Sequence, residues 1–306
     1  MHLIPRPKSV INHEGEFFIE RDTEIILSSE LSFEDLNLAI MIQEEIENLL
    51  DFKLNINKLF MDKKYSNSII LRECKFENEE EYKIEIKENE AIIEGSGAGL
   101  FYGCQSFRQL VREFGACIPN LTIEDSPYFK YRGFYHDVTR GMVPTLDTLK
   151  SLVDKAAFYK INQLQLYIEH TFAFKGMSEV WMDKDPLTAE EILILDKYCK
   201  ERHVELVPSL STFGHLYEAL RSKSFRELCE LEIGDEEYSF VDRMAHHTLD
   251  VTNPKSLDFV ESMLLEFIPL FSSDKFNICC DETFDLGKGK SREKAEKLGV
   301  GKIYTE

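Results

Sequence analysis

The fold of this chain is decided by residues 161–211, which read INQLQLYIEHTFAFKGMSEVWMDKDPLTAEEILILDKYCKERHVELVPSLS. Two apolar runs, 161–169 and 204–211, flank a stretch with helical spacing at 188–202. Thr188 followed by Glu191 is the pattern of a capping box, which marks the start of that helix. Since both runs are apolar like parallel strands covered on both faces, the stretch predicts a βαβ unit.

The same alternation continues on both sides of this unit. Strand patterns occupy 130–138 and 275–282, and helical patterns occupy 145–160, 215–221 and 253–271. Four strands with their helices are about half of a (β/α)8 TIM barrel, which typically needs ~250 residues. We therefore expect an α/β region over residues 126–306 that holds about the first four βα units of such a barrel.

The amino-terminal part has a different order of elements. Strand patterns lie at 17–20, 24–28, 68–73, 82–88 and 90–95, and helical patterns lie at 33–50 and 99–114. A last strand pattern, IPNLTIEDSP, runs into a linker that closes at Pro127. This order predicts a small α+β domain over residues 1–125.

The composition limits the classes of partner. The 306 residues carry a formal net charge of -20, which argues against nucleic acid and anionic membranes, because both require clustered Lys and Arg. No run approaches the ~18 apolar residues of a membrane helix, and the opening MHLIPRPKSV lacks the apolar region of a secretory signal. The seven cysteines have no C-x-x-C spacing. We expect a cytoplasmic protein with reduced thiols and a small or neutral substrate, and the sequence does not indicate its oligomeric state.

The clearest chemical motif is KFNICCDETFDLGKGKS, residues 275–291. A short apolar strand pattern ends there in Asp281 and Glu282, at the carboxyl end where barrel enzymes place catalytic groups. Neighbouring side chains of a strand point to opposite faces, so the two carboxylates can converge only where the strand already turns into its loop. The competing interpretation is a helix cap or a solvated loop, which is the more frequent role of an Asp-Glu pair. The position after a buried strand favours catalysis.

The other strand ends carry further candidates. Arg140 can bind sugar hydroxyls with its forked donors, although a surface salt bridge is the commoner role. Glu169 and His170 follow the second strand beside two phenylalanines that suit either a sugar face or a core. His215 can hydrogen-bond a catalytic carboxylate or serve as a structural histidine.

Two motifs suggest other chemistry and are set aside. The glycines of EGSGAGLFYG do not have the G-x-G-x-x-G spacing of a dinucleotide site, so we interpret them as a tight strand-to-helix turn. His246 and His247 with Asp250 resemble metal ligands, but adjacent histidines do not easily chelate one ion in tetrahedral geometry. We expect no metal and no cofactor.

Taken together, the motifs resemble glycoside hydrolase family 20, the β-N-acetylhexosaminidases. The ordered set YRGFYHDVTRG, KINQLQLYIEHTFAF, VELVPSLSTFGH, LDVTNP and FNICCDE is similar to the catalytic barrel of that family. The part that ends in EGSGAGLFYGCQSFRQLV and IEDSP is similar to the small α+β domain before it. The variants EHTFAF and DETFDLG resemble a bacterial subgroup.

The resemblance implies a retaining exo-acting enzyme for terminal β-linked N-acetylglucosamine or N-acetylgalactosamine. Glu282 would be the general acid and base, and Asp281 would orient the substrate's 2-acetamido group, which attacks the anomeric carbon to form an oxazolinium intermediate. Arg140 would bind hydroxyls and His215 would support the site. Glu169 and His170 would replace the usual polar contacts of the second strand.

The chain also departs from the family pattern. Cys279 and Cys280 stand where glycines commonly precede the Asp-Glu pair, and the single tryptophan, Trp181, is not one of those that wall the acetamido pocket. We therefore expect a partial chain, with an inactive, carbohydrate-binding half-barrel as the alternative. A glycosidase that uses Asp281 as a direct nucleophile is less favoured, because adjacent residues seldom give the ~5 Å carboxyl separation that this requires.

Overall fold

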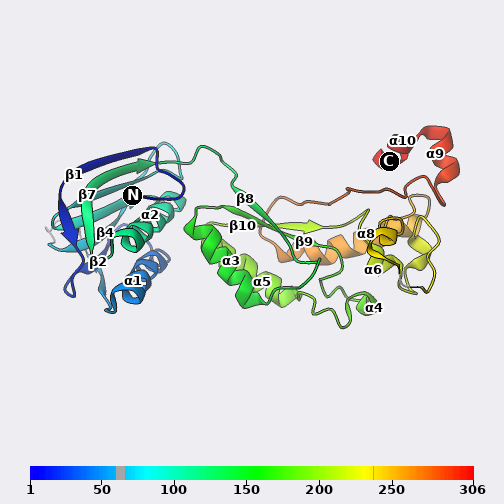
Figure 1. Ribbon diagram of the computed structural model, residues 1–306, viewed down its shortest axis with the longest axis horizontal. Helices are drawn as coiled ribbons and strands as arrows, with labels where there is room; N and C mark the ends of the chain where they lie inside the picture. Colours follow the sequence, from blue (N-terminus) through cyan, green and yellow to red (C-terminus); the bar gives the residue numbers. More distant parts are fainter. Residues whose placement is uncertain (60–65, 237) are drawn as a thin grey trace. The chain divides into compact units, whose positions relative to one another are not determined.

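The computed structural model describes residues 1–59, 66–236 and 238–306. They divide into two compact units, one formed by residues 1–132 and 154–162 and the other by residues 133–153 and 163–306. Each unit has its own sheet (Figure 1). None of the helices in the described residues is long and apolar enough to span a membrane.

The first unit is built on a mixed sheet. Its elements are β1 (Ser9–Phe18), β2 (Glu24–Ser28), α1 (Leu36–Leu50), β3 (Asn55–Leu59), β4 (Ser68–Glu73), β5 (Tyr82–Lys87), β6 (Glu90–Gly95), α2 (Ala98–Phe114) and β7 (Cys117–Asp125). In the described residues, seven strands pair in the order β1-β7-β5-β6-β4-β2-β3. Helices α1 and α2 contact each other and the sheet (Figure 1). The α+β character expected of this part is confirmed, and β3 is a strand that the sequence pattern did not predict.

The core of this unit follows from the strand patterns. Tyr82, Ile84 and Ile86 alternate with more exposed residues along β5 and are buried, so one face of that strand meets the core. The turn from β6 into α2 is tight, because a Cβ atom at Gly95 would lie 2.5 Å from the amide nitrogen of Leu100. Only glycine permits that approach.

The second unit begins the barrel. Its elements are β8 (Gly133–Asp137), α3 (Leu146–Phe158), β9 (Gln163–Ile168), α4 (Ser178–Trp181), α5 (Ala189–Lys200), β10 (Glu205–Leu210), α6 (Tyr217–Leu220), η1 (Arg226–Leu228), α7 (Phe240–Arg243), α8 (Pro254–Phe267), η2 (Ile268–Leu270), α9 (Arg292–Leu298) and α10 (Val300–Thr305). The last five residues of α3 belong to the first compact unit. The expected α/β order, an α+β domain followed by a partial barrel, is confirmed.

Parallel pairing brings the ends of the strands to one edge. Strand β9 lies between β8 and β10, and Gln163 is in register with both Gly133 and Glu205. The carboxyl ends of all three strands therefore lie at the same end of the sheet, which is where a barrel carries its site. The predicted helix start at Thr188 is confirmed, since its hydroxyl accepts a hydrogen bond from the Glu191 amide at 3.2 Å within a complete capping box.

The strand expected at 275–282 is wrong in its extent. Only Asn277 forms a bridge, with Ser209 of β10, and the following residues belong to no strand. Cys279 and Glu282 have φ angles of +43° and +55°, a left-handed conformation that is incompatible with a ladder. The chain thus leaves the sheet just before the Asp281-Glu282 pair.

Candidate active site

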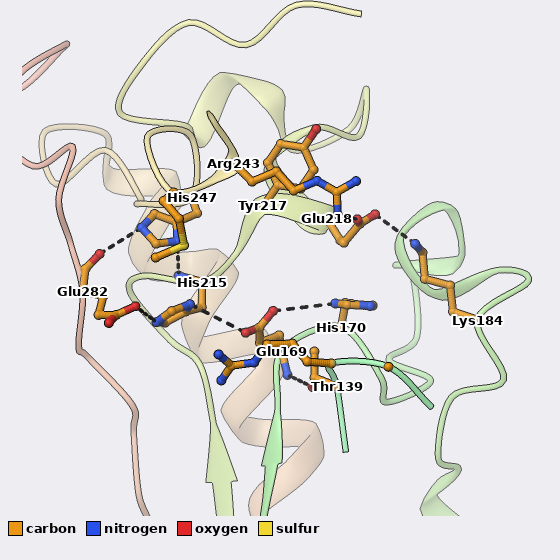
Figure 2. Close-up of a pocket in the computed structure, with 13 residues that line it drawn as sticks. Thr139, Glu169, His170, Lys184, His215, Tyr217, Glu218, Arg243, His247 and Glu282 are labelled. Atoms are coloured by element: carbon orange, nitrogen blue, oxygen red, sulfur yellow. Dashed lines mark hydrogen bonds and ion pairs between the residues drawn. The ribbon is translucent and has the colours of Figure 1, made fainter. Parts of the chain in front are cut away.

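A pocket of about 650 Å³ lies at the carboxyl ends of β8, β9 and β10 (Figure 2). This volume falls in the range of small-ligand sites, ~300–1,000 Å³. The lining residues come from the segments after the strands: Thr139, Arg140, Gly141, Glu169, His170, Lys184, His215, Tyr217, Glu218, Arg243, Met244, His247 and Glu282.

His215 is the centre of this site. Its ring is buried, and Nδ1 lies 3.6 Å from Oε1 of Glu169. On its other side, Nε2 lies 3.5 Å from Oδ2 of Asp281 and 3.3 Å from Oε2 of Glu282. The imidazole therefore lies between Glu169, which is 15% exposed, and the two more exposed carboxyl groups; Figure 2 shows it between Glu169 and Glu282.

Asp281 and Glu282 point toward one imidazole although they are neighbours in sequence. Glu282 has the positive φ of +55°, so the chain is already turning at the pair and both side chains reach the same side. Their side chains are 63% and 46% exposed, which leaves both carboxylates open to a ligand. The convergence predicted for a turning chain is observed.

Glu169 is the least exposed of the three carboxyl groups around His215, with 15% of its side chain exposed. Its Oε1 accepts a hydrogen bond from the Tyr167 hydroxyl at 2.8 Å, and its amide donates to Thr139 Oγ1 at 3.0 Å. Burial raises the pKa of the Glu169 carboxyl above its usual value, although the Tyr167 hydroxyl and the charge of His215 act in the opposite direction. Glu169 is thus a group whose protonation state responds to its neighbours.

Arg140 lines the pocket but is already engaged. Its Nε lies 2.7 Å from Oδ2 of Asp137, and its guanidinium lies 5.1 Å from the centre of the Tyr167 ring. The other oxygen of Asp137 accepts the amides of Thr139 and Arg140 at 2.9 and 3.0 Å. The ion pair holds the arginine at the rim of the pocket, where 55% of its side chain remains exposed.

His170 faces a second end of the pocket. Its Nδ1 lies 4.0 Å from Glu169 and has no hydrogen-bond partner within the described residues, and burial lowers the pKa of the ring. Beyond it, Glu218 pairs with Lys184 at 3.0 Å and with Arg243 at 3.7 Å. This charged end was not predicted, because Lys184 and Arg243 lie in long connections without a motif, and the helical pattern that contains Glu218 carries no chemical motif. The one signal in the sequence that indicated these residues is the general rule that barrel sites are built from the loops after the strands.

His247 also lies in the site and was missed as a site residue. Its Nε2 is 2.9 Å from the carbonyl oxygen of Glu282, and its Nδ1 is 3.2 Å from the amide nitrogen of His215. Within residues 1–59, 66–236 and 238–306, the His, Cys, Asp and Glu side chains form no group of three or more that would hold a metal ion. The seven cysteines are free thiols.

The second unit is therefore a partial (β/α) barrel with a carboxylate and imidazole site at the carboxyl edge of its sheet. Two sequence profiles match the chain: Glycosyl hydrolase family 20, domain 2, over residues 1–126, and Glycosyl hydrolase family 20, catalytic domain, over residues 129–298. The chain belongs to glycosyl hydrolase family 20, and the family predicted from its motifs is confirmed.

Individual proteins agree with this assignment. A β-hexosaminidase of Vibrio furnissii is 25% identical over the whole chain, which covers 52% of that protein. A chitobiase of Flavobacterium johnsoniae has a TM-score of 0.81 at 20% identity, over 99% of this chain and 49% of that one. An exo-β-N-acetylglucosaminidase of Vibrio harveyi, solved with N-acetylglucosamine, has a TM-score of 0.78 at 21% identity, over 98% of this chain and 51% of that one. The chain thus spans about half the length of these relatives.

Proposed function

We propose that this chain carries the catalytic acid of a retaining exo-β-N-acetylhexosaminidase that removes terminal β-linked N-acetylglucosamine or N-acetylgalactosamine. The observation that carries this proposal is the convergence of Asp281 and Glu282 on His215. Membership in family 20 and the β-hexosaminidase names of relatives support it.

Glu282 acts first as a general acid. It donates its proton to the glycosidic oxygen while the bond from that oxygen to the anomeric carbon breaks. The carbonyl oxygen of the substrate's own acetamido group attacks the anomeric carbon, which gives an oxazolinium ion. Glu282, now a carboxylate, takes a proton from a water molecule. The oxygen of this water attacks the anomeric carbon and opens the oxazolinium ring, with net retention of configuration.

Asp281 has a separate role in this scheme. Its carboxylate accepts the acetamido N–H and stabilises the positive charge that develops on the oxazolinium nitrogen. Asp281 does not attack the anomeric carbon, because the nucleophile is the acetamido group of the substrate. Both Asp281 and Glu282 lie at one nitrogen of His215, an arrangement that fits two neighbouring roles better than the opposed carboxylates of a protein-nucleophile mechanism.

The remaining site residues bind and support. Arg140 at the rim offers guanidinium donors to hydroxyls of the terminal sugar. His215 lies between Glu169 and Glu282, 3.6 Å from the first carboxyl group and 3.3 Å from the second, and supports the position of Glu282. His170 extends the polar surface toward the charged end of the pocket.

The test compares glycosides that differ only at C2, using the product of the complete reading frame. We expect release of p-nitrophenol from its β-N-acetylglucosaminide or β-N-acetylgalactosaminide, and none detectable from the β-glucoside. Proton NMR of the first product should show the β anomer. Equal rates on the acetamido and plain sugars would contradict the proposal, and binding of N-acetylglucosamine without turnover would favour a carbohydrate-binding role.

A further inference from the structure

We propose that His247 is a positioning residue: its ring binds the backbone of both Glu282 and His215 and so fixes the position of the general acid Glu282 relative to the His215 imidazole. This inference rests on the proposed function for the roles of those two residues. The contacts that carry it are the hydrogen bonds of the two ring nitrogens, at 2.9 Å to the Glu282 carbonyl and 3.2 Å to the His215 amide (Figure 2).

The two partners of the ring determine its tautomer. The Glu282 carbonyl oxygen can only accept a hydrogen bond, so Nε2 of His247 must carry a proton. The His215 amide can only donate, so Nδ1 must be bare. The neutral Nε2–H form satisfies both contacts, whereas the other neutral tautomer satisfies neither and the imidazolium ion loses the contact to His215.

Both residues held in this way have unusual backbone conformations. His215 and Glu282 have φ angles of +59° and +55°, which non-glycine residues adopt at a cost. After the bridge at Asn277 no strand pairing holds the acid's segment in place. The Glu282 carbonyl accepts instead from His247 and from the Phe284 amide at 2.8 Å. The side chain of His247 thus supplies a contact that a β-ladder would otherwise give.

Packing fixes the ring between the two loops. His247 is 2% exposed, and its ring centre lies 5.0 Å from that of His215 and 6.3 Å from that of Phe284. The His247 carbonyl also accepts the Leu216 amide at 3.0 Å. Residue 247 therefore contacts the segment after β10 with its backbone and with its ring, and a shift of the ring would move the acid and the imidazole relative to each other.

The charged and titratable groups around the ring come from both segments. From the segment that carries Glu282, Oδ1 of Asp285 lies 3.9 Å from Nε2. The negative charges of Asp285 and Glu282 both raise the pKa of the His247 ring. From the segment after β10, the His215 ring faces it. Burial lowers the pKa of His247 while Asp285 opposes that shift, so the ring is neutral near pH 7. Acid conditions that protonate Nδ1 would open the His215 contact.

Three variants of the complete protein test this role by kinetics. His247→Phe keeps a ring of similar size but no nitrogen, and we expect kcat to fall about 100-fold with little change in KM, as for a misplaced catalytic group. His247→Gln keeps an N–H that can reach the Glu282 carbonyl and should recover most of the loss. His246→Phe is the matched control, because that ring packs on Tyr238 at 4.5 Å and its Nδ1 has no hydrogen-bond partner within the described residues.

A second readout is independent of turnover. Ring ¹⁵N–¹H correlation spectra of the same protein should show His247 as the neutral Nε2–H tautomer near pH 7. The protonation of its ring should coincide with an acid loss of kcat that is absent in His247→Gln. The inference is overturned by an Nδ1–H tautomer, or by folded His247→Phe with the wild-type kcat. A wild-type protein that cleaves no acetamido glycoside, yet shows the expected tautomer, would refute the proposed function and leave the two contacts standing.

Discussion

A Cβ atom added to Gly214 would lie 2.5 Å from the carbonyl oxygen of Asp281. The segment after β10 and the segment that carries Asp281 and Glu282 therefore contact each other backbone to backbone. Only a glycine permits this approach, since real Cβ contacts are not this short and a backbone oxygen cannot swing aside as a side chain can. The position of Asp281 therefore depends on the absence of a Cβ atom at residue 214.

Gly214→Ala should displace the Asp281 segment. We expect kcat toward an N-acetylglucosaminide to fall by about 100-fold, as for a displacement of ~1 Å. Gly301→Ala is the control, because a Cβ at Gly301 meets no atom within 4 Å. A Gly214→Ala enzyme with unchanged kcat would show that this contact does not place Asp281.

Glu282→Gln should remove the proposed general acid. We expect kcat to fall by about 10²–10⁴-fold for a p-nitrophenyl glycoside, because the amide cannot donate an acidic proton. The loss should be smaller for a 2,4-dinitrophenyl glycoside, whose leaving group requires no protonation. Equal losses with both leaving groups would assign Glu282 a different role.

Glu169 should make the stability of the second unit depend on pH. Burial raises its pKa in the folded protein, so above the usual value of 4.5 the folded chain binds more protons than the unfolded one. The free energy of unfolding therefore falls as the pH rises through the folded pKa. Urea titrations followed by the fluorescence of Trp181, the single tryptophan, should show this fall in the wild type.

Glu169→Gln should abolish that pH dependence, since the amide does not titrate but can still accept the Tyr167 hydroxyl. The exposed Glu261→Gln should keep it. A wild-type stability that is flat from pH 4.5 to 8 would contradict a raised pKa of Glu169.

Lys160 should have the opposite signature in the first unit. Its ammonium is 2.7 Å from the Tyr82 hydroxyl and 3.3 Å from Asp125, and burial lowers its pKa to about 8. Between about pH 8 and pH 10 the unfolded chain binds more protons, so the free energy of unfolding should rise with pH by about 2 kcal/mol. Urea unfolding followed by circular dichroism measures this rise.

In Lys160→Met the rise should disappear, while Asp125 keeps the hydrogen bond from the Tyr82 hydroxyl at 2.7 Å. The exposed Lys197→Met, with 81% of its side chain in solvent, is the control and should behave as the wild type. A rise that persists in Lys160→Met would assign the titration to another group.

Much of the fold was predictable because it depends on local chemistry. The apolar runs at β9 and β10 and the capping box at Thr188 act within a few residues of themselves. The strand β3 was missed because NINKL alternates only weakly and is defined by its pairing with β2. The end of the fourth strand was misjudged because apolar residues alone do not reveal a left-handed backbone at Cys279.

The site was predictable only in its members that follow strands. The positions of Arg140, Glu169, His170, His215, Asp281 and Glu282 after apolar runs were enough to select them, although their roles remain proposals. Lys184, Arg243 and His247 belong to long connections, where sequence spacing carries no periodic signal. Glu218 lies in the helical pattern at 215–221, whose spacing does not distinguish a site residue from a solvated one. Their selection required the course of those connections in space.

The sequence by itself determined the family, the order of the elements and the carboxylate pair at 281–282, because these follow from ordered motifs and local periodicity. Only the tertiary structure decided that Gly214 lies against Asp281, that His215 lies between Glu169 and Glu282, and that His247 binds the backbone of both His215 and Glu282. These contacts join segments far apart in the chain, and their geometry depends on strand register and left-handed turns that no local pattern encodes. The Asp281-Glu282 motif is visible in the sequence, whereas the position of the pair relative to the His215 imidazole is a property of the folded loops.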